Sequence, residues 1–170
     1  MEYKRNSDPH YYESHCFASN CGSFALNLQG WYDPEPYFED GHGDIAEWIE
    51  EADYDGWSDI EKSDFYADVL IDGMLIEFAD ELRILNSEKD DLYVDEELIA
   101  FRTYCIMEEE EGWEPYPRWD FHFRVFRDGR WQEKQGDNPV NNECNIEDWG
   151  KYISEIYYFA HKVILEEDDE

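Results

Sequence analysis

A cysteine at the start of a short apolar helix is the residue of this chain best suited to chemistry. One face of this predicted helix carries Cys21, Phe24, Ala25 and Leu28, and Gly30 ends the helix. A thiol at a helix N-terminus lies beside free N–H groups and the positive end of the helix dipole, which favour the thiolate. We therefore expect Cys21 to be a nucleophile whose own N–H faces a developing oxyanion, with Gly22 and Ser23 leaving room for a substrate carbonyl.

A nucleophilic thiol needs a base, and His122 is the best-placed candidate. It lies in WDFHFRVFR, residues 119–127, whose alternation predicts a strand with two different faces. One face carries Phe121, Phe123 and Val125, and the other carries His122, Arg124 and Phe126. Asp128-Gly129 then predicts a tight hairpin turn into RWQEK, residues 130–134. This hairpin can supply an orienting residue for His122: Asp137, Asn138 and Glu133 all qualify, and we take Asp137.

Two segments carry a family resemblance. NCGSFALN, residues 20–27, is similar to the NC-small/aromatic-x-YAL start of papain-like (NlpC/P60-like) cysteine hydrolases of bacteria and phages. DFHFRVFRDGRWQEKQGDNPV, residues 120–140, resembles their later block D-[FY]-H-[FW]…DG-x-W-x-x-K-x-G…PV. The resemblance implies a hydrolase of peptide or amide bonds with Cys21 as nucleophile and His122 as base. Where relatives often have W-x-H-K-x-G, this chain has Trp131-Gln132-Glu133-Lys134, so their second histidine is replaced.

The charge of the chain restricts its partners. Its 170 residues include 45 Asp and Glu against 13 Lys and Arg, a formal net charge of −32. Hydrophobic residues make up 42%, with 7 Trp, 13 Tyr and 10 Phe, so we expect a folded single domain and not a polar disordered tail. Nucleic acid and anionic membranes are poor partners for such a surface, whereas a basic protein surface is a natural one.

A regular series of acids suggests a second function. Asp64, Asp68 and Asp72 are each four residues apart, so they form one helical stripe with a carboxylate every ~6 Å of axis. With Asp59, this stripe resembles the regular charges of a nucleic-acid strand. The alternative to a hydrolase is therefore a nucleic-acid mimic of the anti-restriction or anti-defence kind, which blocks a basic DNA- or RNA-binding protein. A solvated face, adaptation to high salt, and an acidic structural protein of a virus remain as simpler interpretations.

The cysteine and histidine spacings indicate neither a metal site nor a disulfide framework. Cys16 and Cys21, with His10 and His15 nearby, fit no zinc pattern, and no calcium loop is present. Four cysteines in 170 residues are too few for a disulfide-rich fold, so we expect reduced thiols in a cytoplasm, that of the host if a phage encodes the protein. We expect no cofactor and no membrane span, since no apolar run is long enough.

The order of elements predicts an α+β fold, papain-like by resemblance, with N-terminal helices packed on an antiparallel sheet. We expect an irregular arm over residues 1–14 and an acidic helical insertion over residues 42–80, with Asp44 and Ser58 capping its two helices. Strands are predicted at residues 82–86, 97–107 and in the hairpin. A C-terminal amphipathic helix over residues 146–165 and an acidic tail over residues 165–170 complete the expected chain.

Overall fold

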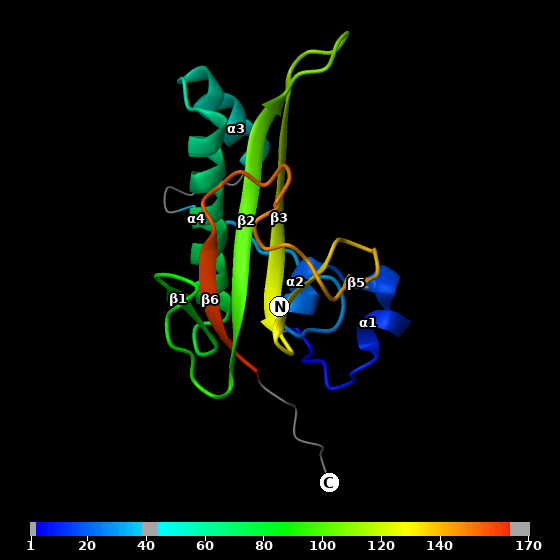
Figure 1. The fold of residues 1–170 in the computed structure, drawn as a ribbon. Coiled ribbons are helices and arrows are strands. Elements are labelled where there is room, and N and C mark those ends of the chain that lie inside the picture. The colour runs from blue at the N-terminus through cyan, green and yellow to red at the C-terminus, as the bar shows by residue number, and fades with distance from the viewer. Residues whose placement is uncertain (1–2, 39–43, 164–170) are drawn as a thin grey trace.

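The computed structural model describes residues 3–38 and 44–163 (Figure 1), so the acidic tail and the first two residues of the predicted insertion lie outside the described residues. The helices are α1 (Tyr11–Ser14), a 3-10 turn (Cys16–Ala18), α2 (Cys21–Ala25), α3 (Ile45–Tyr54) and α4 (Asp59–Glu77). The strands are β1 (Leu82–Leu85), β2 (Glu96–Glu108), β3 (Tyr116–Arg127), β4 (Arg130–Lys134), β5 (Val140–Asn141) and β6 (Tyr157–Lys162).

The six strands form one sheet in the order β1-β6-β2-β3-β4-β5, and every described pair is antiparallel. The predicted α+β class is therefore confirmed. The longest pairing joins β2 to β3, in register from Leu98 opposite Phe126 to Glu108 opposite Tyr116. These two strands form the long axis of the molecule (Figure 1).

The predicted C-terminal helix over residues 146–165 is wrong. Its described part is an irregular segment followed by β6, which lies between β1 and β2. Phe159 is paired with Ile84 on one side and Ile99 on the other, and it is only 1% exposed. Phe159, Ala160 and His161 are buried in succession, so both faces of β6 are covered and its apolar residues carry no clean two-residue period. The aromatic and β-branched run around Phe159 suits this position, and sheet pairing overrides the helical pattern.

The predicted helix caps and the predicted hairpin turn are confirmed, because each depends on the hydrogen bonding or backbone conformation of neighbouring residues. Asp44 accepts hydrogen bonds from the N–H groups of Ala46 and Glu47 at the start of α3. Ser58 and Glu61 form a reciprocal capping box at the start of α4. The hairpin turn between β3 and β4 has positive φ at both Asp128 and Gly129, 55° and 79°, as its sequence predicts.

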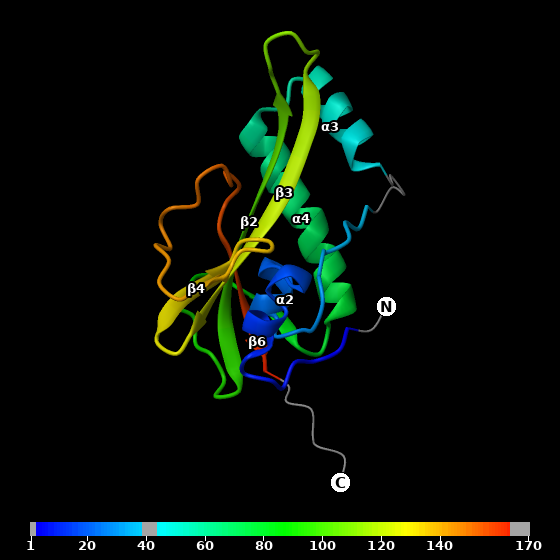
Figure 2. The ribbon, with the colours of Figure 1, turned by 90° about the vertical axis from the view of Figure 1, so that its right-hand side faces the viewer.

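The helices and the segment before β6 cover opposite sides of the sheet (Figure 2). α2, α3 and α4 pack on one face, where Phe101, Phe123 and Phe159 are buried among their apolar side chains. Residues 142–156 cross the other side (orange in Figure 2), where His122 and Arg124 lie. The predicted separation of the two faces of β3 is confirmed, and it determines which side chains reach the candidate site.

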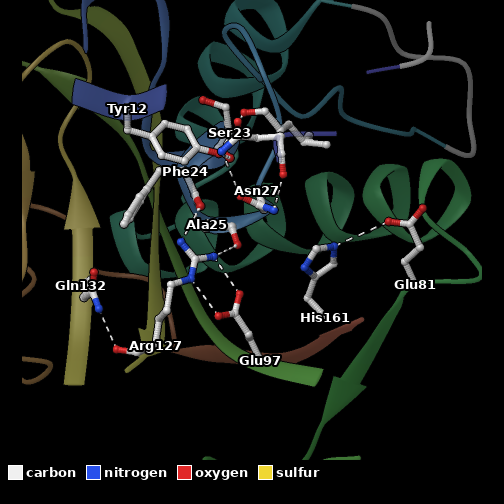
Figure 3. A network of polar contacts seen from close by, with 12 residues as sticks. Tyr12, Ser23, Phe24, Ala25, Asn27, Glu81, Glu97, Arg127, Gln132 and His161 are labelled. Carbon is white, nitrogen blue, oxygen red and sulfur yellow. Dashed lines mark hydrogen bonds and ion pairs between the residues drawn. The ribbon is translucent and has the colours of Figure 1, made fainter. Parts of the chain in front are cut away.

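A half-buried arginine ties α2 to the sheet (Figure 3). Arg127 at the end of β3 forms two hydrogen bonds of 2.7 Å with Glu97 of β2, and it also donates to the carbonyls of Phe24 and Ala25. Its guanidinium lies 5.0 Å from the centre of the Phe24 ring. A cation at the carbonyl end of a helix is electrostatically favourable, so Arg127 helps to hold even this short helix in place.

Candidate active site

The candidate site lies at an open edge of β3. β3 pairs with β4 only through Val125–Arg127, so in the described register its outer edge has no strand partner at His122 and Phe123. A cavity of about 600 Å³ lies there, lined by the start of α2, by β3 and β4, and by the segment that precedes β6. Cys21 and His122 both line this cavity, although they are far apart in the sequence.

Asn20 determines where α2 begins. Its side chain accepts a hydrogen bond from the Ser23 N–H at 3.1 Å, and the Ser23 hydroxyl accepts one from the Asn20 N–H at 2.9 Å. The same amide group donates to the Tyr32 carbonyl at 2.7 Å and accepts from the Tyr32 N–H at 3.1 Å. Asn20 therefore fixes both the helix that carries Cys21 and the chain that passes beside it. The sequence pattern alone indicated only its position as a helix start.

The environment of the thiol differs from the expected one. α2 has only five residues, so its dipole is small, and Cys21 is 6% exposed. Burial raises the pKa of Cys21 to about 12, although hydrogen bonding to the backbone at Phe123 and Gly22 acts in the opposite direction. The prediction that the helix start favours the thiolate is therefore wrong for the free protein, because the cost of burying the charge is larger.

Gly22 serves packing instead of substrate access. A Cβ atom at this position would lie 2.8 Å from Cδ1 of Tyr32, 2.9 Å from the Tyr32 carbonyl oxygen and 3.3 Å from Cε2 of Phe123. Such distances leave no space for a side chain, and the space beside Gly22 is already filled. The absent side chain lets α2 lie directly against β3, which brings Cys21 to the strand edge.

His122 is held from two directions. Its Nε2 lies 3.2 Å from Oε2 of Glu133 on β4, and both side chains are about 95% buried. Its ring stacks on Tyr152, with centroids 5.4 Å apart and an interplanar angle of 21°, and meets Trp149 edge-on at 6.0 Å. Within residues 3–38 and 44–163, no hydrogen bond joins the ring to Cys21, and Nδ1 has no hydrogen-bond partner.

Glu133 is an ionised carboxylate at the centre of the site. Burial acts to raise its pKa, but hydrogen bonding and charge from His122 and Arg124 outweigh burial and lower the pKa to about 2. Arg124 forms a buried ion pair with it and donates to the carbonyls of Asn145 at 2.9 Å and Asp148 at 2.6 Å. Glu133 and Arg124 therefore join the histidine to the segment that covers the cavity.

Asp137, the predicted orienting residue, lies elsewhere. It is exposed in the loop after β4, and its carbonyl accepts a hydrogen bond from Cys16 Sγ at 3.2 Å. The residue that contacts His122 is Glu133, one of the alternatives and the residue that replaces the second histidine of the W-x-H-K-x-G pattern. Trp149 and Tyr152 were missed because residues 146–165 were expected to form a helix and not a cavity wall.

Two further carboxylates lie beside the thiol. Asp33 and Asp120 line the cavity, and both act electrostatically on Cys21. Burial raises the pKa of Asp33, and the nearby Asp120 raises it further. Across the described ranges, neither carboxylate forms an ion pair. This side of the cavity is therefore acidic.

The four predicted partner-binding aspartates do not form a free stripe. Asp59 lies 3.2 Å from the Lys62 ammonium group. Asp64 accepts a hydrogen bond of 2.7 Å from the N–H of Glu155. Burial raises the pKa of Asp68, which is also hydrogen-bonded to Tyr157. Only Asp72 of the four is both exposed and outside such contacts among the described residues. Asp59 pairs within α4, and Asp64 and Asp68 join α4 to the chain around Glu155 and Tyr157.

The described part of the chain offers neither a metal-binding group of side chains nor a helix that could cross a membrane. No group of three or more His, Cys, Asp or Glu side chains is arranged there to hold a metal ion. No described helix has the length and apolar character to cross a membrane.

Comparisons with known proteins assign the chain to no family, because no protein-family model, curated protein or solved structure matches it. The resemblance to papain-like hydrolases therefore rests on the two quoted segments alone.

Proposed function

We propose that this protein is a cysteine hydrolase of the papain-like kind that cleaves a peptide or amide bond. Cys21 is the nucleophile, His122 is the general base, and Glu133 is the residue that orients the imidazole. The observation that carries the proposal is the shared cavity: Cys21 and His122 line it together, while Glu133 holds His122 through Nε2. This leaves Nδ1 as the nitrogen that can take up the thiol proton.

The high pKa of Cys21 determines how such an enzyme works. Because the thiol is protonated at neutral pH, His122 removes its proton as the sulfur attacks the substrate carbonyl. The imidazolium that forms is stabilised by the ionised Glu133 and then gives the proton to the leaving amine. Water hydrolyses the resulting thioester and restores the thiol. The N–H of Cys21 is the candidate oxyanion donor.

The charge of the cavity favours a cationic substrate. Asp33 and Asp120 attract a lysine or arginine side chain near the bond to be cleaved, whereas the net charge of −32 repels anionic substrates. A basic peptide is therefore the substrate class that we propose.

The test is reaction with a peptide chloromethyl ketone that ends in lysine, followed by mass spectrometry of the labelled cysteine. This electrophile alkylates Cys21 in the intact protein, and His122→Ala slows the reaction about 100-fold because the base is lost. An analogue that ends in glutamate reacts more slowly.

Two other cysteines are matched controls for this test. Cys144 lines the same cavity and is hydrogen-bonded to Glu133, so its own rate of labelling is the comparison: Cys21 reacts faster in the native protein. Cys105 is fully buried, and burial raises its pKa to about 12, as it does for Cys21. Labelling of Cys21 no faster than that of Cys105 in the native protein contradicts the proposal.

The extreme charge supports a second candidate function, binding of a basic protein in place of nucleic acid. Protamine is a suitable basic, DNA-binding probe. The mimic binds it at low salt, loses it steeply as salt rises, and is displaced by duplex DNA. Binding that ignores added DNA contradicts mimicry.

A further inference from the structure

The connection between β2 and β3 projects beyond the body of the molecule (Figures 1 and 2). The ladder of these strands ends at Glu108 opposite Tyr116, and residues 109–115 form the tip. Neither neighbouring strand follows them so far: β6 reaches only Phe101 of β2, and β4 reaches only Val125 of β3. This two-stranded part packs against α3 and α4 on one face, and the tip projects past these helices (Figures 1 and 2).

The tip presents a large aromatic side chain to solvent. Trp113 is 74% exposed and has no aromatic or cation–π contact with a residue of the described ranges. The tip is nevertheless ordered, because the N–H of Trp113 donates to the Glu110 carbonyl at 3.1 Å and Gly112 has a φ of +87° that suits glycine. An indole held in water on an ordered turn is the kind of side chain that anchors protein interfaces.

Acids surround this tryptophan, and one of them, Glu110, is hydrogen-bonded to Tyr116. Glu109, Glu110, Glu111 and Glu114 are exposed, and none of them forms an ion pair with a described residue. Arg118 is the nearest cation along the strand, and it lies 3.8 Å from Glu108 instead. Like charges this close repel one another, which costs free energy in the free protein. The exposure of the apolar indole to water is a second cost. A partner that covers them removes both costs.

We propose that residues 109–115 are a docking element for a basic protein whose apolar patch is bordered by lysines or arginines. Trp113 packs on the apolar patch, and the four glutamates pair with the surrounding cations. Charge complementarity identifies this partner, since anionic membranes and nucleic acid are repelled. The inference deepens the second candidate function and is independent of Cys21. It also places the contact with the basic protein at the hairpin tip instead of on α4, where Asp64 and Asp68 already form hydrogen bonds.

The experiment uses the full chain and a fluorescent amphipathic peptide with leucines on one face and lysines on the other. Binding is followed by fluorescence anisotropy. Trp113→Ala raises Kd about tenfold, the effect expected from removing one anchoring tryptophan. Tyr54→Ala is the matched control, because Tyr54 is a 91% exposed aromatic on acidic α3, outside the tip. It leaves Kd unchanged.

A second pair of variants separates the tip from net charge. One replaces Glu109, Glu110, Glu111 and Glu114 with glutamine, and the other neutralises four exposed acids elsewhere: Glu47, Glu50, Asp72 and Asp80. Both remove four charges, but the tip variant weakens binding more and has a smaller salt dependence.

The outcomes distinguish the two levels of the inference. Equal weakening by both charge variants, or equal Kd for Trp113→Ala and Tyr54→Ala, overturns the role of the tip while leaving binding of a basic protein intact. Failure of the unmodified protein to bind the peptide overturns both. Circular dichroism of each variant excludes loss of fold as the cause.

Discussion

Glu133 is the carboxylate to which both His122 and Arg124 of the candidate site bind. The same oxygen, Oε2, receives His122 Nε2 and Arg124 Nε, and the side chain is 5% exposed. A buried charge is tolerated only where it is paired in this way. Glu133 therefore gives the site a fixed negative charge.

Glu133→Gln tests this charge through stability. The folded-state pKa of about 2 is below the ordinary value of 4.5, so the carboxylate contributes stability that is complete above about pH 4.5 and is lost as pH falls toward 2. At pH 7 we expect Glu133→Gln to lower the free energy of unfolding by about 2–3 kcal/mol, the scale of that shift. Urea unfolding at pH 7 and near pH 3 measures the change.

Glu143→Gln is the control for this prediction, because Glu143 also lines the cavity but its side chain is 84% exposed. It changes the free energy of unfolding little at either pH. If Glu133→Gln and Glu143→Gln behave alike at pH 7, the buried carboxylate does not hold the site together.

At the scale of elements, the contact between α2 and β3 decides where the thiol lies. α2 is too short to be stable by itself, and it is held by Asn20 at its start, by Arg127 at its end and by Gly22 at its contact with the sheet. The contacts at Arg127 and Gly22 are tertiary, which explains why helical spacing alone predicted a longer helix.

Gly22→Ala tests the close approach. The added methyl group overlaps Tyr32 and lies close to Phe123, so we expect the free energy of unfolding to fall by about 1–3 kcal/mol, the usual effect of overpacking. Labelling of Cys21 by the lysine chloromethyl ketone changes as well, because α2 shifts away from β3. Thermal unfolding and the labelling rate are the two measurements.

Gly129→Ala is the comparison, since Gly129 has a φ of +79° and open space around it. It costs about 1 kcal/mol of backbone strain and leaves the labelling of Cys21 unaltered. A Gly22→Ala protein as stable as wild type, with unchanged labelling, contradicts the packing argument.

For the molecule as a whole, net charge opposes compactness. At −32, the acids repel one another over distances that low salt does not screen, since the Debye length is about 30 Å at 0.01 M and about 3 Å at 1 M. The cations are few, and several of them are already paired with an acid: Lys62, Arg83, Arg124 and Arg127. The surface therefore remains strongly negative after folding.

Salt should accordingly stabilise the protein. We expect Tm to rise as sodium chloride increases, and each kcal/mol of relieved repulsion corresponds to about 2–4 °C for a chain of this size. The variant with four glutamines in the tip has a higher Tm at low salt and a smaller response. Differential scanning calorimetry measures both, and a Tm that falls with salt contradicts the argument.

The order of amino acids was enough to predict the features that depend on neighbouring residues. The caps at Asp44 and Ser58, the turn at Asp128-Gly129 and the two faces of β3 follow from local hydrogen bonding and side-chain period, so they could be predicted. Cys21 and His122 were identified from residue type and motif, and the structure brings both to one cavity.

The remaining features depend on contacts between distant parts of the chain. β6 became a central strand because the edges of β1 and β2 needed hydrogen-bond partners, which no local pattern records. That choice turned residues 142–156 into a covering segment and brought Trp149 and Tyr152 to His122, whereas the β3–β4 hairpin made Glu133, and not Asp137, the partner of His122. Burial, which also depends on the whole fold, reversed the expected shift of the Cys21 pKa.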